Sequence, residues 1–377
     1  MMSRRSLVRG SLALLLTAGG TPVMAAETIT IGVQLPQSGE RAAVGRTIRN
    51  AVEMAMEDVN RTGGINGAAL VAVWEDTRDS AEGAVAAIRG LIAQPRVVAV
   101  VGELFSPFAM ASRDAVEQAG IPYLVGGTSP RTTAGAQWIF RVGASDALLG
   151  DLLARYTAET LKPKKLAVLS SRVGIHNTRA DLLVKALEGR YRIAPVVRDT
   201  WKPDDRDFTP QLDKVKAASA DAIIALGETS EGAAFLKQVA ALPGHPVVIG
   251  HRDFGAKSVL EEAGAAAEGV LIVTEYMPAL LDAERQSWAQ AFRRRYGAEP
   301  SIIAAQHYDA VVLLAEAMKR TGPTRPQVKA GLEQLRGFHG VMADYTFDAG
   351  REGVHRFYVV RIRGGTPSLD TVLDERP

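Results

Sequence analysis

Short apolar runs alternate with amphipathic segments along most of the chain. Most of these runs are continuously apolar and rich in β-branched residues, which is typical of strands covered by helices on both faces. The segments between them, such as 46–61 and 86–94, repeat their apolar residues with helical spacing. This alternation predicts βαβ units and parallel sheets with right-handed crossovers. The predicted strands are residues 29–35, 69–76, 97–102, 122–126, 166–171, 194–201, 222–227, 246–251 and 269–274.

The alternation divides into two similar sets, residues 27–145 and 146–274. We expect the segment 138–146, "WIFRVGASD", to cross from one lobe to the other. No Pro/Gly/Ser-rich linker separates the sets, so the lobes should be joined by short crossings. Three helical patterns and two strand-like segments follow, at 284–296, 301–321, 326–337, 341–348 and 356–363.

The first 25 residues have the pattern of a secretory signal peptide. A basic start precedes an apolar run at 11–20, and Val23 and Ala25 fit a cut before Ala26. The run is too short to span a bilayer, which needs about 20 apolar residues. Its paired arginines fit a twin-arginine signal as well as an ordinary one. We therefore expect an exported protein.

Composition excludes several classes of protein. The 377 residues, 47% of them hydrophobic, are enough for more than one core. The 44 basic and 42 acidic residues give no case for binding nucleic acid or a charged membrane surface. Cysteine is absent, so disulfides and a thioether lipid anchor are excluded. We expect a soluble, free periplasmic protein.

The acids Glu75, Asp76 and Asp79 follow the second predicted strand. A calcium loop would need more oxygen ligands at regular spacing, so we interpret them as turn and cap residues. Asp79 and Ser80 are predicted to cap the next helix. The glycines at 63 and 64 are predicted to end the first helix, where a left-handed residue is needed.

Two strand ends share an unusual form. Ser106 is a plausible N-cap with Pro107 at the first helical position, and Thr128 and Ser129 precede Pro130. Ligands bind beyond the carboxyl ends of open parallel sheets. A hydroxyl beside free N–H groups at a helix start suits a carboxylate. Ordinary helix caps remain the alternative.

Enzyme signatures are missing from the sequence. There is no dinucleotide fingerprint, phosphate loop, nucleophile elbow or paired-histidine zinc motif, and the histidines are scattered. No base stands beside a serine in the sequence, so no set of residues suggests nucleophilic catalysis. We expect no enzyme activity, no cofactor and no metal.

A series of motifs follows a characteristic order and spacing along the chain: Ser38-Gly39, Gly45, "NRTGGINGAAL" (60–70), "EDTRDSAEGA" (75–84), "VGELFSP" (101–107), "GIPYLVGGTSP" (120–130), "DFTPQLDKVKAASADAIIALG" (207–227) and "HYDA" (307–310). In these motifs the chain resembles the periplasmic solute-binding proteins of branched-chain amino acid ABC transporters, the Leu/Ile/Val-binding family. The resemblance covers nearly all of the mature chain.

The resemblance implies a type I periplasmic binding fold, an α/β fold. Two Rossmann-like lobes with parallel sheets are joined by three hinge crossings and close on a solute between them. Residues 26–145 with 275–352 would form the N-terminal lobe, and 146–274 with 353–377 the C-terminal lobe. The implied partners are a small carboxylate-bearing solute, an amino acid or related organic acid, and the inner-membrane permeases of an ABC importer. We expect a monomer.

The family's binding residues can be carried over position by position. The hydroxyls of Ser106 and Thr128 would hold the ligand's carboxylate. The backbone near Gly127 and Ser129 would assist them. The N-terminal lobe would also place two side chains, those of Val44 and Phe105, on the cleft wall.

The C-terminal side departs from the family. Arg252 stands where amino-acid binders usually have an acid that pairs with the ligand's ammonium, and Glu228 stands where an aromatic is usual. Either Asp253 or Glu228 takes over the ammonium, or the ligand is not an α-amino acid. A second aromatic is also replaced, with Val173-Gly174 or Ile175-His176 as the nearest matches.

Two other functions stay open at this stage. A sensing module of the same fold could have the same sequence features, and an exported α/β enzyme is the remaining alternative. A DNA-binding relative is disfavoured, because the chain begins with a signal peptide rather than a helix-turn-helix.

Overall fold

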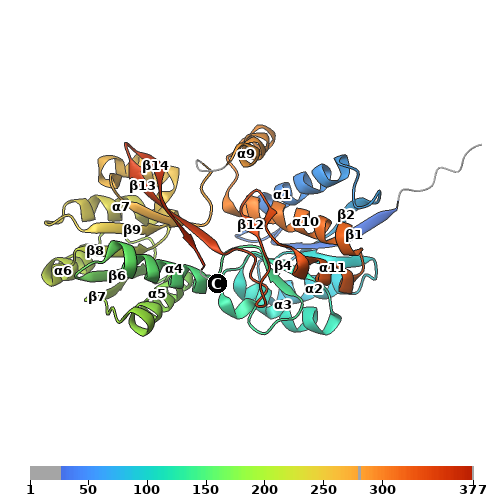
Figure 1. Cartoon of the computed structure of the whole chain (residues 1–377), viewed down its shortest axis with the longest axis horizontal. Coiled ribbons are helices and arrows are strands. Elements are labelled where there is room, and N and C mark those ends of the chain that lie inside the picture. The colour runs from blue at the N-terminus through green and yellow to red at the C-terminus, as the bar shows by residue number, and fades with distance from the viewer. Residues whose placement is uncertain (1–26, 279–281, 376–377) are drawn as a thin grey trace, which may run out of the picture.

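The computed structural model describes residues 27–278 and 282–375, which form two α/β lobes side by side (Figure 1). The predicted signal peptide, residues 1–25, lies outside the described residues. The first lobe, the N-lobe, is built on a sheet with the strand order β2-β1-β3-β4-β5. The second, the C-lobe, is built on a sheet with the order β14-β13-β10-β9-β8-β6-β7.

All neighbouring strands of the N-lobe sheet are parallel. In the C-lobe sheet β6 to β10 are parallel, and β13 and β14 are added antiparallel at one edge. The strands are β1 (Thr28–Leu35), β2 (Ala69–Asp76), β3 (Val97–Val101), β4 (Tyr123–Val125), β5 (Ile139–Arg141), β6 (Leu166–Ser171), β7 (Val197–Trp201), β8 (Ala222–Leu226), β9 (Val247–His251), β10 (Leu271–Thr274), β13 (Arg356–Arg363) and β14 (Thr366–Asp374), with a separate pair β11 (Phe338–His339) and β12 (Asp344–Tyr345).

Helices cover both faces of each sheet, as the continuously apolar strands require. In β3, for example, Ala99 and Val101 pack into the core beneath α1 and α10, and Val100 packs towards α2 and α3. The helices are α1 (Ala42–Arg61), α2 (Ala81–Ile92), α3 (Ser106–Ala119), α4 (Asp146–Tyr156), α5 (Gly174–Ala186), α6 (Thr209–Ala218), α7 (Thr229–Ala240), α8 (Lys257–Ala263), α9 (Ala283–Tyr296), α10 (Ile302–Thr321) and α11 (Arg325–Gln334).

The two-lobed α/β fold with parallel sheets is confirmed, and each of the nine predicted strands overlaps an observed strand, whereas the strand-like segment 341–348 forms only the two-residue strand β12. Two local predictions were incomplete. The segment 138–146 contains a strand of its own, β5, before it leaves the lobe. The edge strand β14 was not foreseen, because most of its side chains face solvent and it has no apolar run.

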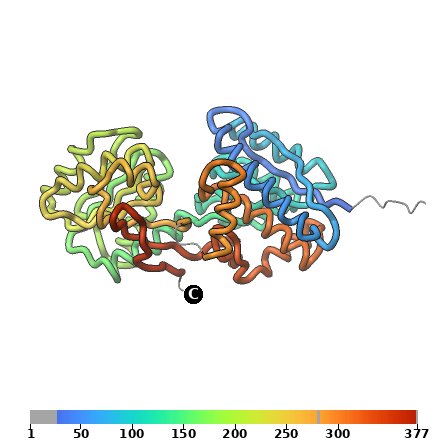
Figure 2. Tube along the Cα trace, turned by 90° about the horizontal axis from the view of Figure 1, so that it is seen from above, coloured from blue at the N-terminus to red at the C-terminus, as the bar shows by residue number. Residues whose placement is uncertain are grey.

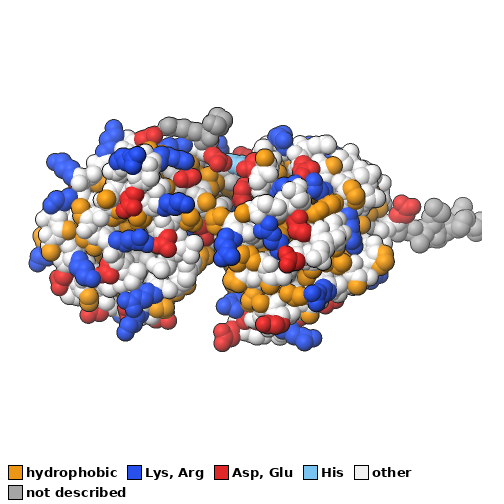
Figure 3. Space-filling view, turned by 90° about the horizontal axis from the view of Figure 1, so that it is seen from below, with side chains coloured by type: hydrophobic (Ala, Val, Ile, Leu, Met, Phe, Trp, Pro, Cys, Tyr) orange, Lys and Arg blue, Asp and Glu red, His pale blue; other side chains and the backbone are white. Residues whose placement is uncertain are grey.

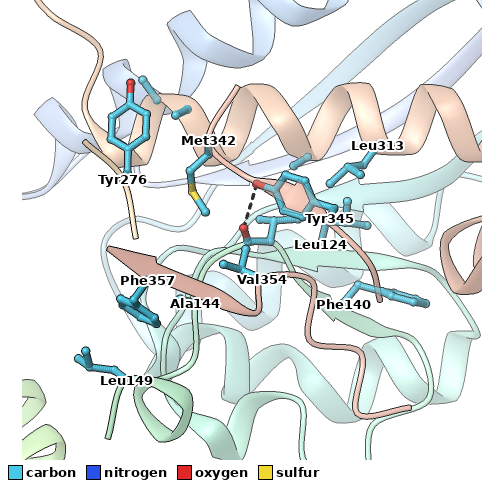
Figure 4. Packing of buried hydrophobic residues seen from close by; sticks show 14 of the residues in the cluster. Leu124, Phe140, Ala144, Leu149, Tyr276, Leu313, Met342, Tyr345, Val354 and Phe357 are labelled. Atoms are coloured by element: carbon cyan, nitrogen blue, oxygen red, sulfur yellow. Dashed lines mark hydrogen bonds between the residues drawn. The ribbon is translucent and has the colours of Figure 1, made fainter. Parts of the chain in front are cut away.

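The hydrophobic core continues from one lobe to the other. The chain passes between the lobes at 142–145, after β10 and at 346–355, and the tube in Figure 2 shows these connections. Ala144, Tyr276 and Val354, one from each connection, belong to one buried cluster that also contains core residues of both lobes. Figure 4 shows this packing. The connections are therefore part of a packed hinge rather than loose tethers.

The lobe boundaries at 26–145 with 275–352, and at 146–274 with 353–377, stay a proposal. Helices α1 and α10 pack on one another, and α10 and α11 contact β3, which supports assigning α10 and α11 to the N-lobe. The strands β13 and β14 belong to the C-lobe sheet, in keeping with the boundary near 353.

Candidate ligand-binding site between the lobes

The loops after β3 and β4 meet on the N-lobe side of the site. Ser106 Oγ accepts a hydrogen bond from the Ser129 N–H at 3.1 Å. Gly127 lies against the same serine, since a Cβ there would stand 2.8 Å from Ser106 Oγ. Thr128 donates its hydroxyl to Asp146 Oδ2 at 2.8 Å. The structure thus brings together the four residues expected to hold a carboxylate.

The prediction that Ser106 caps helix α3 was wrong by one residue. Helix α3 begins at Ser106, its N-cap is Phe105, and no side chain caps it. The Ser106 oxygen instead accepts from the neighbouring loop. A hydroxyl that accepts one hydrogen bond can still donate its own proton, so Ser106 can donate to an anion at this helix start.

An arginine that the sequence did not single out lies beside the predicted wall residue Phe105. The Arg41 guanidinium carbon lies 4.8 Å from the centre of the Phe105 ring, and its Nη1 lies 2.6 Å from Asp79 Oδ1. Val44 stands in the first turn of α1, partly buried against the core. The N-lobe wall therefore combines an aromatic ring with a paired cation.

Glu103 is a fully buried carboxyl group at the end of β3. Its Oε1 accepts a hydrogen bond from the Phe105 N–H at 3.2 Å, whereas Oε2 is buried without a hydrogen-bond partner. Burial raises the pKa of Glu103 to about 7, despite the opposing hydrogen bonds from the Phe105 and Leu104 amides. No sequence pattern pointed to this buried carboxyl group, because its burial follows from packing.

On the C-lobe side, Glu228 follows β8 and precedes α7. Its Oε1 lies 2.9 Å from Nε2 of His176, in the first turn of α5. His176 is 1% exposed, whereas Ile175 is 39% exposed. Of the two alignments left open for this loop, the structure places His176 at the wall and Val173 at the N-cap of α5.

Arg252, Asp253 and their partners lie at the ends of β9 and β10. Arg252 Nη1 pairs with Glu275 Oε1, and His251 Nδ1 lies 2.9 Å from Asp253 Oδ2. Glu275, directly after β10, was not singled out in the sequence. The Arg252 guanidinium is therefore engaged within the C-lobe.

Burial and neighbouring charges shift the pKa values of these groups. Burial lowers the pKa of His251 well below its usual value, and the nearby arginines add to this effect. Burial would raise the pKa of Asp253, but its hydrogen bond to His251 and the nearby arginines hold it well below its usual range. Burial also opposes the charge on Arg252, yet Glu275 and three other carboxylates raise its pKa.

Asp146 connects the two walls. It is 4% exposed and begins α4, and it accepts from Thr128 on the N-lobe and, at 2.7 Å, from Arg179 Nε on α5. The Asp146 N–H also donates to the Thr128 carbonyl at 2.9 Å. Neither Asp146 nor Arg179 was predicted from the sequence. The available signal was an acid placed directly after the predicted crossing between the lobes.

Of the three acids predicted as turn or cap residues, Asp76 holds a turn, Asp79 belongs to the N-lobe wall, and Glu75 lies within strand β2 instead. Asp76 accepts from the backbone of Gln37 and from the Ser38 hydroxyl. Ser80 caps α2, but Asp79 does not, because its carboxylate pairs with Arg41. In the described part of the chain, no group of three or more histidine or acidic side chains could hold a metal ion.

The space-filling view shows a notch between the two lobes (Figure 3).

A family model described as periplasmic binding protein matches residues 28–366. The chain belongs to the periplasmic binding protein family. Among the helices that the structure describes, none has the length and apolar character needed to cross a membrane.

Relatives within this family bind amino acids. The chain is 27% identical over 329 residues to a leucine-, isoleucine-, valine-, threonine- and alanine-binding protein from Pseudomonas aeruginosa, covering 86% of this chain and 87% of the relative. It is 27% identical to a leucine-specific-binding protein from Salmonella typhimurium, covering 85% and 86%.

A solved structure agrees with these relatives. The branched-chain amino acid transporter substrate-binding protein of Streptococcus pneumoniae, in complex with isoleucine, superposes with a TM-score of 0.75 at 26% identity. The match covers 93% of this chain and 100% of that one. The family and these relatives identify the chain as a solute-binding protein.

Proposed function

We propose that this periplasmic binding protein captures a small carboxylate, an amino acid or related organic acid, between its lobes and delivers it to inner-membrane permeases. The arrangement of Ser106 beside Gly127 and Ser129 is the observation that carries the proposal. The start of α3 carries a partial positive charge, and the Ser106 hydroxyl adds a donor. Together they suit a carboxylate.

Closure of the lobes would complete the site. The N-lobe supplies the carboxylate subsite, and the C-lobe faces it with Glu228 and His176. The lobes are joined through the hinge around Tyr276 and Val354, and rotation about such a hinge would bring the two walls together. We propose that the protein acts as a monomer, which size-exclusion chromatography with light scattering would test.

The relatives are substrate-binding proteins, and we propose that this chain likewise binds its solute without altering it. In the described part of the chain, no histidine contacts Ser106, so a serine nucleophile would lack its base. Mass spectrometry of the solute recovered after incubation would detect any conversion.

Export is part of the proposal. We propose that residues 1–25 are removed, because their basic start, apolar run and small residues fit a signal peptide. A mature protein beginning at Ala26 in the periplasmic fraction would agree with this, and a chain retained in the cytoplasm would contradict it.

Calorimetry with a panel of small carboxylates tests the binding site. Ser106→Ala removes the hydroxyl donor and should weaken binding of whichever carboxylate binds by about tenfold, the value of one hydrogen bond to a charged group. Ser287→Ala, at an exposed position of α9, serves as the matched control. Equal affinities of wild type and Ser106→Ala would remove this serine from the site.

A further inference from the structure

The C-lobe wall carries more negative than positive charge. The side chains gather where the strands β6, β8, β9 and β10 end, and each carboxylate among them contributes to the electrostatic environment of Arg252. Two guanidinium groups stand against four carboxylates. The charged and titratable members are Asp146, Glu228, Asp253, Glu275, Arg179, Arg252, His176 and His251.

Both arginines of this wall are already committed. Arg252 pairs with Glu275, whose side chain is 3% exposed. Arg179 pairs with Asp146 at 2.7 Å, and the two side chains are 3% and 5% exposed. Each guanidinium already compensates a buried carboxylate, and removing that compensation is strongly unfavourable. A second anionic group on the ligand would therefore have to share an arginine with one of these carboxylates.

Glu228 is in a different situation. Its side chain is 43% exposed and meets His176 at 2.9 Å. Among the described residues, no lysine or arginine lies within ion-pair distance of it. Its position is nevertheless fixed, because its backbone N–H donates to Glu231 Oε2 at 2.8 Å. Glu228 is thus an accessible carboxylate on a rigid support.

Two orphaned polar atoms in the same wall also point to a missing partner. His176 Nδ1 and Glu275 Oε2 are both buried without a hydrogen-bond partner. Buried polar atoms are normally satisfied by protein, water or ligand. They belong to the residues that pair with Glu228 and Arg252, which is consistent with a wall completed by a bound solute.

This inference rests on the proposed function: we infer that Glu228 determines specificity by accepting a hydrogen bond from a cationic nitrogen of the ligand. His176 orients the Glu228 carboxylate, and Arg252 serves a structural role in its ion pair with Glu275. The ligand is then a small zwitterion. Its carboxylate meets Ser106 and the start of α3, and its protonated nitrogen meets Glu228. This arrangement offsets the surplus negative charge of the C-lobe wall and leaves the Arg252–Glu275 pair intact.

Matched probes test the inference. Calorimetry and thermal shift at neutral pH would compare the proteinogenic amino acids, their des-amino carboxylates and short dicarboxylates. Every binder is expected to carry a protonated nitrogen. Glu228→Gln should weaken such a binder by at least about tenfold, the value of a charge-assisted hydrogen bond. The exposed Glu261→Gln on α8 serves as the matched control.

The outcomes separate this inference from the proposed function. If no carboxylate binds the wild type, the proposed function fails. If carboxylates bind equally with and without the nitrogen, or Glu228→Gln retains full affinity, the proposed function stands and the inference is overturned. A dicarboxylate that binds best and depends on Arg252 would also overturn it.

A second variant distinguishes recognition from a merely structural role. Glu228→Asp keeps the charge and should restore part of the preference for the aminated probe over its des-amino partner. A structural defect in either variant would weaken both probes alike and leave that ratio unchanged, which would contradict the inference.

Discussion

Replacing Glu103 with glutamine should make the stability of the protein less sensitive to a rise in pH from 4.5 to about 7. The Glu103 carboxyl is fully buried at the end of β3, with one oxygen accepting from the Phe105 N–H and the other without a partner. Glutamine keeps the acceptor for Phe105 and cannot ionise. The substitution therefore removes one proton equilibrium while largely preserving the shape of the side chain.

The raised pKa decides whether the free energy of unfolding rises or falls with pH. Burial raises the pKa of Glu103 from 4.5 to about 7 in the folded protein. Between these values the folded state holds a proton that the unfolded state has lost, so the free energy of unfolding falls as pH rises. The stabilising contribution is complete below the unfolded pKa and is lost as pH rises through the folded pKa.

The size of this change in stability follows from the difference between the unfolded and folded pKa values. Each pKa unit corresponds to about 1.4 kcal/mol. The interval from 4.5 to about 7 is therefore worth about 3 kcal/mol. In Glu103→Gln the amide NH2 group takes the place of the unpartnered Oε2. Burying this group without a hydrogen-bond partner should lower the free energy of unfolding by about 1 kcal/mol, equally at every pH.

Urea unfolding, followed by tryptophan fluorescence from about pH 4.5 to about pH 8.5, would measure the free energy of unfolding of both proteins. The free energy of unfolding of Glu103→Gln minus that of the wild type should rise by about 3 kcal/mol over this pH range. The exposed Glu188→Gln should show no such trend. Parallel curves for wild type and Glu103→Gln, within about 1 kcal/mol, would refute the reasoning.

Two further predictions concern stability. Glu352→Gln removes the carboxylate that lies 2.7 Å from the fully buried Arg141 guanidinium. It should lower the free energy of unfolding, measured in urea, by about 3 kcal/mol. A loss below about 1 kcal/mol would indicate that water already screens this ion pair. Phe235→Ala should cost about 3 to 5 kcal/mol, since this buried ring contacts Trp201, Phe208 and Phe254, and an unchanged melting temperature would contradict this packing argument.

The candidate site was only partly predictable. Ser106, Gly127, Thr128 and Ser129 could be found because each follows an apolar strand, and parallel strand ends share one edge of a sheet. The direction of their hydrogen bonds was not predictable. Ser106 accepts from another loop, and Thr128 donates to Asp146, because the two loops and α4 converge only after folding.

The charge pattern of the C-lobe wall shows the same limit. Arg252, standing in place of the usual acid, left open a ligand that is not an α-amino acid. The structure pairs it with Glu275, 23 residues further along the chain, and places Glu228 beside His176, 52 residues before it. These partners depend on the order β10-β9-β8-β6 in the sheet, which no local pattern encodes.

Most of the strands, most of the helices and the two-lobed α/β class were predictable, because burial on both faces leaves an apolar run and glycines such as Gly64 mark helix ends. The strands β5 and β14, the shared hinge core and the ion pairs between strand ends emerged only when distant segments packed together. Apolar burial follows a short period along the chain, whereas the strength and partner of a charge depend on which distant segments exclude water around it.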